Sequence, residues 1–561
     1  MLFKKLKRSK SMSLVALLLV IALAIFAGAC DPERTTGDVV DDDDNSEEFN
    51  ALSDPVEDPS VPLVNYISGP DALSMGVSAN ANVLTLGLMP GNITKDINLN
   101  WYSSGAPSDK VAKVRFVRGT FTSGRGLIEE TGEVSTAGSS TAHKVTVKDL
   151  WTGANYQYMV SSDGENWSEA YDFKVPSVTG AFKFAVIADP QLHATTWDIL
   201  NRYTPTGGAN TGAGWIETMQ KIVATGVSFI ASGGDQVDAS GGNEGEYTLF
   251  YAPPGLRSLP FAPVAGNHDN HLNFNYHYNL PNVQNDSTGT EAGRNYFYLY
   301  NNILFVVLNT APYPTSTQLA APYITKFDNT LKAAKAAHPK YDWLIVQHHK
   351  STASVADHCA DRDIQYYVEA GFEKVMSEHH VDFVLAGHDH VYARSYPLQG
   401  RDGGKVSVPV KQGFNAASGS TWTNPGNPIY LTFTTGSGLK YYAVAADKTS
   451  VYANTLYVRP GTGDGANASY PYLGEVTNAN GDSSTKFGSV DYLTGEYLPV
   501  SNAAYVQPYI PSYCIAEVNG KTITFRTYAI ATVTGQVTGA AEGYSFNANT
   551  PYDSITVTKT N

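Results

Sequence analysis

Cysteine is scarce in this chain of 561 residues, whose three cysteines are Cys30, Cys359 and Cys514. So few cysteines exclude a small fold that is held together by disulfide bonds. Basic residues are also in the minority, with 38 Lys and Arg against 53 Asp and Glu and a formal net charge of -15. Because binding a nucleic-acid backbone takes clustered Lys and Arg, this balance predicts no nucleic-acid partner.

The apolar run near the N-terminus, residues 14–27, is shorter than the roughly 20 residues that a membrane-spanning helix needs. A basic stretch precedes it and Ala27-Gly28-Ala29-Cys30 follows it, an order typical of an export signal. These last four residues resemble a bacterial lipoprotein signal, in which Cys30 is lipidated after cleavage. An ordinary secretory signal is the alternative. We therefore predict a signal peptide over residues 1–29 and an exported cell-envelope lipoprotein, on the periplasmic or cell-surface side of a bacterial membrane.

Two regions of different character follow the predicted signal. Residues 30–61 are polar and acidic, a composition too poor in apolar surface to fold, so we expect a disordered tether. Residues 62–177 contain short runs in which apolar and polar residues alternate between turn residues, which is typical of an all-β sandwich. Trp101, Leu150 and Tyr156 in these runs resemble the core residues of a fibronectin type III-like domain.

The pattern changes at about residue 180, where strand-like apolar runs begin to alternate with helix-like stretches such as 214–225, 316–337 and 364–378. This alternation predicts that residues 178–561 form an α/β domain of two packed β-sheets flanked by helices. Within it, residues 440–511 form a Gly-, Asn- and Tyr-rich insertion with weak periodicity, which we expect to cover part of the site mouth. Residues 513–559 supply the last strands, with a hairpin around Asn519-Gly520.

Five apolar runs of this domain end in side chains that can bind metal ions. They lead into Asp189, Asp235, Asn267-His268, His348-His349 and His388-Asp389-His390. In open α/β folds, ligands gather outside the carboxyl ends of the strands. Carboxylate, amide and imidazole groups suit Zn, Mn or Fe, and a carboxylate can bridge two ions. The pattern therefore predicts a site in which two metal ions clamp a phosphate group.

These residues resemble the motif set of the calcineurin-like metallophosphoesterases, and the β-rich front domain, the stretch GHDHVYARSYP and the closing segment resemble the purple acid phosphatase branch. The resemblance implies that one metal ion is bound by Asp189, Asp235 and His390, with Gln191 as a further ligand, and that a second is bound by Asp235, Asn267, His349 and His388. It also implies that His268 is the catalytic proton donor to the leaving oxygen, or a clamp on the phosphate.

Two positions depart from the resembling families. Gln191 stands where many members have histidine, so we expect weaker binding of the first ion. Asp238 stands where purple acid phosphatases carry a tyrosine, so we expect a colourless enzyme and no iron(III)-specific first site. His348 and His349 cannot both face the site, because neighbouring side chains of a strand point to opposite faces. The spacing from Val346 in the resembling pattern favours His349.

Three further residues are candidates for binding substrate, namely His193, Lys350 and His358, and each can also be interpreted as a surface residue. The whole pattern predicts a binuclear metal-dependent phosphoesterase that acts through a metal-bound hydroxide. The resemblance to acid phosphatases implies that its substrates are small phosphate monoesters. A phosphodiesterase or nucleotide hydrolase is the alternative among enzymes. A surface binding protein with a decayed site is the alternative outside them.

Overall fold

The computed structural model describes residues 81–193, 211–239, 244–284, 292–356, 358, 361–400, 407–442, 473–477, 483–487, 490–491, 501–532 and 546–560. The predicted signal peptide, the acidic tether, Cys30 and Cys359 lie outside these residues. Among the residues that are described, no helix combines the length and the apolar character needed to cross a membrane.

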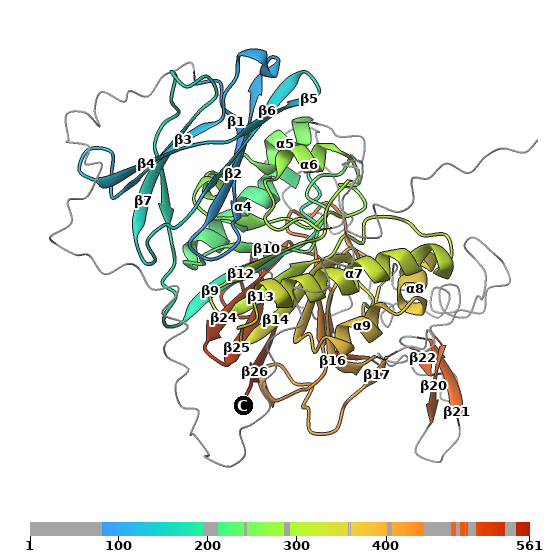
Figure 1. Cartoon of the computed structure of the whole chain (residues 1–561). Helices are drawn as coiled ribbons and strands as arrows, with labels where there is room; N and C mark the ends of the chain where they lie inside the picture. The colour runs from blue at the N-terminus through green and yellow to red at the C-terminus, as the bar shows by residue number, and fades with distance from the viewer. Residues whose placement is uncertain are drawn as a thin grey trace, which may run out of the picture. The chain divides into compact units, whose positions relative to one another are not determined.

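Two antiparallel sheets form the first part of the described chain (Figure 1), with strand orders β1-β2-β6-β5 and β4-β3-β7-β8. Their strands are β1 (Leu84–Pro90), β2 (Ile97–Ser104), β3 (Lys113–Arg118), β4 (Arg125–Thr131), β5 (Glu133–Ala137), β6 (Ser140–Val147), β7 (Asn155–Ser161) and β8 (Tyr171–Lys174). Alternate residues such as Leu99, Val114 and Val145 pack in one core with Trp101, which is fully buried. The predicted all-β sandwich is therefore confirmed.

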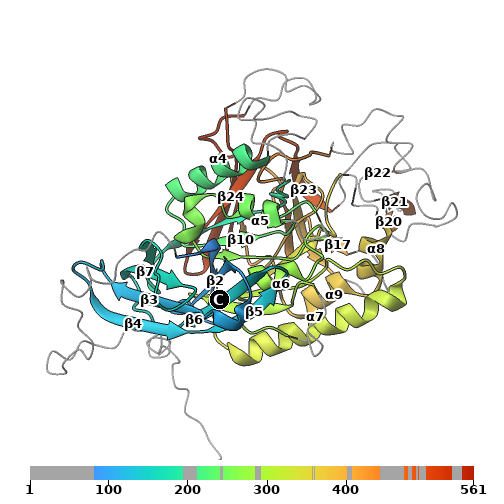
Figure 2. The same ribbon diagram turned by 90° about the horizontal axis from the view of Figure 1, so that it is seen from above.

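A larger domain with two mixed sheets follows (Figures 1 and 2). One sheet has the order β11-β10-β9-β24-β25-β26-β18, and the other has the order β12-β13-β14-β15-β19-β16-β17, with β23 paired to β16. The strands are β9 (Phe182–Ile187), β10 (Ile230–Ser232), β11 (Phe261–Ala262), β12 (Tyr296–Tyr300), β13 (Ile303–Val307), β14 (Trp343–Lys350), β15 (Phe383–Gly387), β16 (Tyr392–Gln399), β17 (Val408–Pro409), β18 (Ser420–Thr423), β19 (Ile429–Thr432), β23 (Asn502–Val506), β24 (Ser512–Asn519), β25 (Thr522–Ala529) and β26 (Asp553–Thr558).

Helices cover the outer faces of both sheets. The helices of this domain are α4 (Thr211–Ala224), α5 (Glu244–Phe250), α6 (Asn273–His277), α7 (Thr317–Ala337), α8 (Arg362–Glu369) and α9 (Phe372–Glu378), with the short 3-10 helix η3 (Pro254–Arg257). Another 3-10 helix, η2 (Pro107–Asp109), lies in the sandwich between β2 and β3. The predicted α/β domain of two packed sheets flanked by helices is confirmed. The single helix expected over 364–378 was wrong. Two helices stand there because Gly371 between them has φ 108°, a left-handed conformation that interrupts the helical path.

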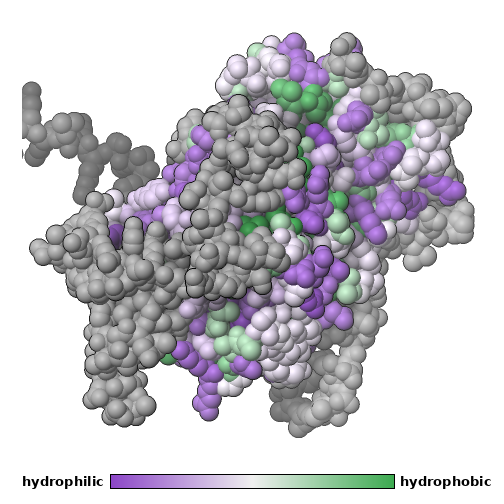
Figure 3. Space-filling view, turned by 180° about the vertical axis from the view of Figure 1, so that it is seen from behind, coloured by the Kyte–Doolittle hydropathy of each residue, from purple (hydrophilic) through white to green (hydrophobic). Residues whose placement is uncertain are grey.

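Apolar side chains fill the three spaces between these layers. Phe184 and Phe305 pack between the two sheets, Trp215 of α4 packs against the sheet that contains β9, and Phe327 of α7 packs against the other sheet. On the face shown in Figure 3 the described residues are mainly polar, and apolar residues show in small separate areas. The apolar side chains of this domain therefore lie mostly between its layers, away from water.

The C-terminal strands and part of the predicted insertion are regular. β24 and β25 pair around Asn519-Gly520, with Asn519 opposite Thr522, as the hairpin signal predicts. Residues 440–511 contain more regular structure than their weak periodicity indicated. They include the small antiparallel sheet of β20 (Leu473–Thr477), β21 (Ser483–Phe487) and β22 (Val490–Asp491), as well as β23.

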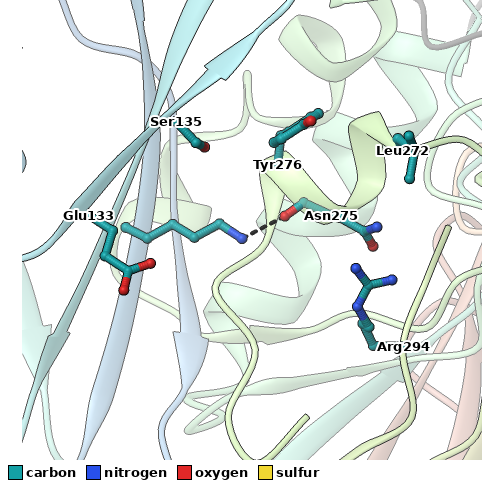
Figure 4. A pocket seen from close by; sticks show the side chains of 7 residues that line it. Glu133, Ser135, Leu272, Asn275, Tyr276 and Arg294 are labelled. Atoms are coloured by element: carbon teal, nitrogen blue, oxygen red, sulfur yellow. Dashed lines mark hydrogen bonds between the residues drawn. The ribbon is translucent and has the colours of Figure 1, made fainter. Parts of the chain in front are cut away.

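The sandwich contacts the larger domain at α6 (Figure 4). Lys144 Nζ on β6 donates hydrogen bonds to the carbonyl oxygens of Asn275 at 2.5 Å and Tyr278 at 2.7 Å. Burial, with the nearby Arg294 charge, lowers the pKa of Lys144 to about 8. A cavity of about 180 Å³ opens beside this lysine, between Glu133 of β5 and Arg294. These contacts hold α6, which follows the Asn267-His268 loop closely in the chain.

Candidate metal centre

Parallel strands from both sheets deliver the predicted ligands. β9, β10 and β11 run parallel in one sheet, and β14 runs parallel to β15 in the other. Asp189, Asp235, Asn267 and His388 lie in the loops that follow β9, β10, β11 and β15. His349 differs from the prediction because it lies inside β14 rather than after the strand.

Three ligand-type side chains converge around His349. Its Nε2 lies 3.2 Å from Asp235 Oδ2 and 3.0 Å from Asn267 Oδ1. The same nitrogen lies 3.1 Å from His388 Nδ1. His349 Nδ1 is 2.8 Å from the carbonyl oxygen of Gly233, which can only accept, so Nδ1 carries the proton. In a neutral His349 ring the lone pair of Nε2 would therefore face the other three groups, as in a histidine that binds a metal ion.

A second group of donors lies around Asp189. His390 Nε2 is 3.5 Å from Asp189 Oδ1, while its Nδ1 is 2.9 Å from the carbonyl oxygen of Lys440. The carbonyl again fixes the proton on Nδ1 and leaves a lone pair on Nε2. Gln191 is fully buried, and its Nε2 donates to Asp238 Oδ1 at 2.9 Å. Among the described residues its Oε1 has no hydrogen-bond partner.

The backbone of these loops is strained at the predicted ligands. Positive φ values between 43° and 73° occur at Asp189, Gln191, Asp235, His388 and His390. Residues with a side chain seldom adopt this conformation, and such strain clusters at functional sites. Motif glycines make room for the ligands, because a Cβ added at Gly387 would collide with the Asp189 carboxylate, and one at Gly266 with Asp235.

The charge states fit a pair of cations. Burial and the neighbouring Asp235 raise the pKa of Asp189 well above its usual range. Burial also acts to raise the pKa of Asp235, but the adjacent His349 outweighs it and holds that pKa below its usual range. Burial lowers the pKa values of His388 and His390 well below the usual range, so both rings are neutral, as a metal-binding imidazole must be. Adjacent buried carboxylates, neutral imidazoles and the unpartnered Gln191 oxygen are a donor set that bound cations would complete.

His268 lies at the edge of this cluster with its side chain 27% exposed. Its backbone N–H donates to Asp235 Oδ1 at 2.9 Å. Its Nδ1 is 2.5 Å from the carbonyl oxygen of Asp238, so Nδ1 carries a proton and Nε2 is left for a ligand. This arrangement fits a histidine that exchanges a proton with a substrate.

Neighbouring side chains of β14 point to opposite faces of the sheet, so His348 and His349 have different surroundings. His349 faces the cluster, whereas the His348 ring packs 4.7 Å from Phe372, and neither of its nitrogens has a partner among the described residues. Burial, with the nearby His349, lowers the pKa of His348 to about 3. Lys350 shares the face of His348, and its Nζ is 2.5 Å from Asp363 Oδ2. The structure thus brings His349 into the cluster, while the Lys350 ammonium group is engaged with Asp363.

The two other substrate candidates, His358 and His193, have different surroundings. The His358 ring is 4.3 Å from the His388 ring, and His358 Nδ1 is 2.6 Å from Asp361 Oδ2. His193 is 46% exposed, and its Nδ1 lies 3.3 Å from Asp238 Oδ2. His358 is therefore placed against a predicted ligand, and His193 beside a residue that contacts Gln191.

Two buried aspartates that the sequence reasoning left without a role position the ligand loops. Asp269 accepts backbone N–H groups from Gly266 at 3.0 Å and Gln236 at 3.1 Å, which joins the loops of Asn267 and Asp235. Asp389 accepts the backbone N–H of His358 at 2.8 Å. Each stands next to a predicted histidine within its motif, and an acid in that position was the only signal in the sequence.

Comparisons with known proteins agree with this geometry. Residues 182–392 match the family model "Calcineurin-like phosphoesterase". Acid phosphatase type 7 of Mus musculus is 22% identical over 306 residues, 52% of this chain and 62% of that protein. An uncharacterized protein of Mycobacterium tuberculosis is 22% identical over 343 residues, 57% of this chain and 63% of its own length. The chain thus spans less than two thirds of these curated relatives.

A solved structure shares the fold. The purple acid phosphatase from yellow lupin (Lupinus luteus) seeds superposes with a TM-score of 0.54 at 12% identity, covering 85% of this chain and 75% of that chain. Residues 182–392 are therefore similar to the calcineurin-like phosphoesterases, and the fold of the described residues is similar to that of the yellow lupin enzyme.

Proposed function

We propose that this chain is a binuclear metal-dependent phosphoesterase that hydrolyses small phosphate monoesters. The observation that carries the proposal is the position of His349 Nε2, within 3.2 Å of Asp235, Asn267 and His388 donor atoms. Two ions bound there and at the Asp189 group would polarise phosphate oxygens and lower the pKa of a coordinated water. The match to the calcineurin-like phosphoesterases supports the same reaction class.

The chain's own residues have separate tasks in this reaction. Asp235 would be the ligand shared by the two cations. His268 would give a proton from Nε2 to the leaving oxygen, while the Asp238 carbonyl holds its Nδ1–H in place. The Tyr442 ring lies 4.7 Å from His358 and 5.3 Å from the His390 ring, so the start of the predicted insertion borders the site. This placement supports a role of the insertion in substrate choice.

Hydrolysis of para-nitrophenyl phosphate and bis(para-nitrophenyl) phosphate, measured with added Mn²⁺ or Zn²⁺, tests the proposal. We expect the monoester to be hydrolysed at least about 10-fold faster. We expect Asn267→Ala to lower the rate by about 100-fold, since loss of a ligand weakens metal binding. Asn155→Ala, an exposed change on β7, is the matched control. A preference for the diester would favour the phosphodiesterase alternative, and no hydrolysis with any metal would favour the binding protein.

We further propose that the protein is exported and anchored to a bacterial membrane through a lipidated Cys30. The basic stretch, the apolar run and Ala27-Gly28-Ala29-Cys30 support this location. Expression in bacteria with a labelled fatty acid tests it. Label and membrane association are expected in the wild-type chain and not in Cys30→Ser. A secreted, unlabelled wild-type chain would instead indicate an ordinary secretory signal.

A further inference from the structure

The two positions at which this chain departs from the resembling families contact each other. Gln191 follows β9 and Asp238 follows β10, and Gln191 Nε2 donates to Asp238 Oδ1 at 2.9 Å. Gln191 is fully buried and the Asp238 side chain is 26% exposed. Both departures are therefore parts of one local arrangement beside Asp189.

The carboxylate of Asp238 decides which way the Gln191 amide is turned. A carboxylate oxygen only accepts hydrogen bonds, so the amide NH₂ group of Gln191 must face it. The amide oxygen then lies on the other side, where Oε1 is buried without a hydrogen-bond partner among the described residues. A buried acceptor without a partner is unfavourable, so a cation that accepts the lone pair of this oxygen would stabilise it.

The two cation positions differ in the chemistry of their donors. If Gln191 Oε1 takes part, the first position would have three oxygen donors, from Asp189, Asp235 and Gln191, and one nitrogen donor from His390. The second position has oxygen donors from Asp235 and Asn267, and its two other ligands are the imidazoles of His349 and His388. Carboxylate and carbonyl oxygens suit Mg²⁺ and Mn²⁺, whereas imidazole suits Zn²⁺ and the later transition metals.

We infer that the Gln191–Asp238 pair makes the first cation position a site for a hard divalent cation, Mn²⁺ or Mg²⁺, and that Asp238 positions the Gln191 oxygen toward it. The inference rests on the two-cation site of the proposed function and is independent of the ester that is hydrolysed. Asp238 contributes a second feature that suits this role, because its backbone carbonyl, rather than its carboxylate, makes the shortest contact with His268. A change of the Asp238 side chain can therefore alter Gln191 while the carbonyl contact to His268 stays.

Calorimetric titration of the metal-stripped full-length chain with Mn²⁺ tests the positioning role. Asp238→Ala removes the acceptor for Gln191 Nε2, and we expect it to weaken Mn²⁺ binding at one of two positions by about 10- to 100-fold. Asp238→Asn keeps an acceptor oxygen, so we expect affinity within about 3-fold of the wild type. Asp109→Ala removes an aspartate whose side chain is 75% exposed, and it is the control that should change nothing. Circular dichroism of the metal-free variants checks that each is folded.

A second titration tests the ion type. Gln191→His replaces an oxygen donor by imidazole, so we expect the ratio of Zn²⁺ to Mn²⁺ affinity at one position to rise at least about 10-fold. Unchanged Mn²⁺ binding in Asp238→Ala, equal losses in the Ala and Asn variants, or an unchanged ratio in Gln191→His would each overturn the inference. A failure of the proposed function would give a different result. The wild type would bind Mn²⁺ tightly but would hydrolyse no phosphate ester.

Discussion

The sandwich and the larger domain both bury histidines, yet they surround them differently. In the sandwich, His143 is fully buried, its Nε2 lies 2.7 Å from Ser103 Oγ, and its ring stacks 4.9 Å from Trp101. In the larger domain, His349 is equally buried but faces an aspartate, an asparagine and another histidine. Burial of a histidine is therefore no sign of a site by itself. A functional site is indicated where several donor atoms direct their lone pairs into the same space.

Among the changes that test this contrast, Asp235→Asn is expected to have the largest effect on activity, because it removes the carboxylate proposed to be shared by both cation positions. We predict a loss of phosphoesterase activity of about 10,000-fold, equivalent to roughly 5 kcal/mol of transition-state stabilisation. Steady-state hydrolysis of para-nitrophenyl phosphate in excess Mn²⁺ measures it. A loss below about 10-fold would show that the donors around Asp235 do not act on the substrate.

His268→Ala tests the role of a proton donor separately from the role of the cation ligands. We predict a loss of about 1,000-fold with an alkyl phosphate, since general acid catalysis contributes about 100- to 10,000-fold. The loss should be much smaller with para-nitrophenyl phosphate, because nitrophenolate leaves with little need for a proton. Rates for both esters in the variant measure the difference, and bound metal should be unchanged. Equal losses for the two esters would assign His268 to phosphate binding instead.

The sandwich histidine is predicted to act on stability rather than on activity. Burial lowers the pKa of His143 from about 6.5 to about 4. Below pH 6.5 the unfolded chain takes up a proton that the folded chain does not bind. This contribution to stability is therefore fully present above pH 6.5 and falls by about 3 kcal/mol as the pH drops to 4. Chemical denaturation at both pH values should show a shallower pH dependence in His143→Gln. An identical dependence in both chains would contradict the prediction.

The smallest effect is expected for a change of His348, the neighbour of His349 in β14. His348 is buried against Phe372 with two unpartnered nitrogens, so His348→Leu removes polar atoms from an apolar space. We predict that it raises the free energy of unfolding by about 1 kcal/mol and leaves bound metal unchanged. Denaturant titration and metal analysis of the purified variant measure both quantities. Loss of metal in this variant would place His348, rather than His349, in the cluster.

Part of this contrast could be predicted from the sequence. Period-two alternation predicted the sandwich, and apolar runs that end in Asp, Asn or His predicted which loops meet. The motif glycines also carried real information, because Gly266 and Gly387 leave room that a side chain would fill. These signals are local in the chain, so they need no knowledge of the tertiary fold.

The rest depends on contacts between distant positions. Gln191 and Asp238 are 47 positions apart, and only the fold brings the two departures together. Lys350 next to His349 was a reasonable substrate candidate, but its partner Asp363 on α8 shows only in the structure. The helix is interrupted at Gly371. The sequence shows a glycine there, but a glycine alone does not predict that the backbone is left-handed.

The number of metal ions bound per chain tests the central claim most directly. Purified protein loaded with Mn²⁺ and desalted is analysed by mass spectrometry of its metal content, beside Asp235→Asn. We predict about two ions per wild-type chain and fewer than about one in the variant. A wild-type chain that binds fewer than about one ion, or a variant that binds as many as the wild type, would contradict the proposed shared site.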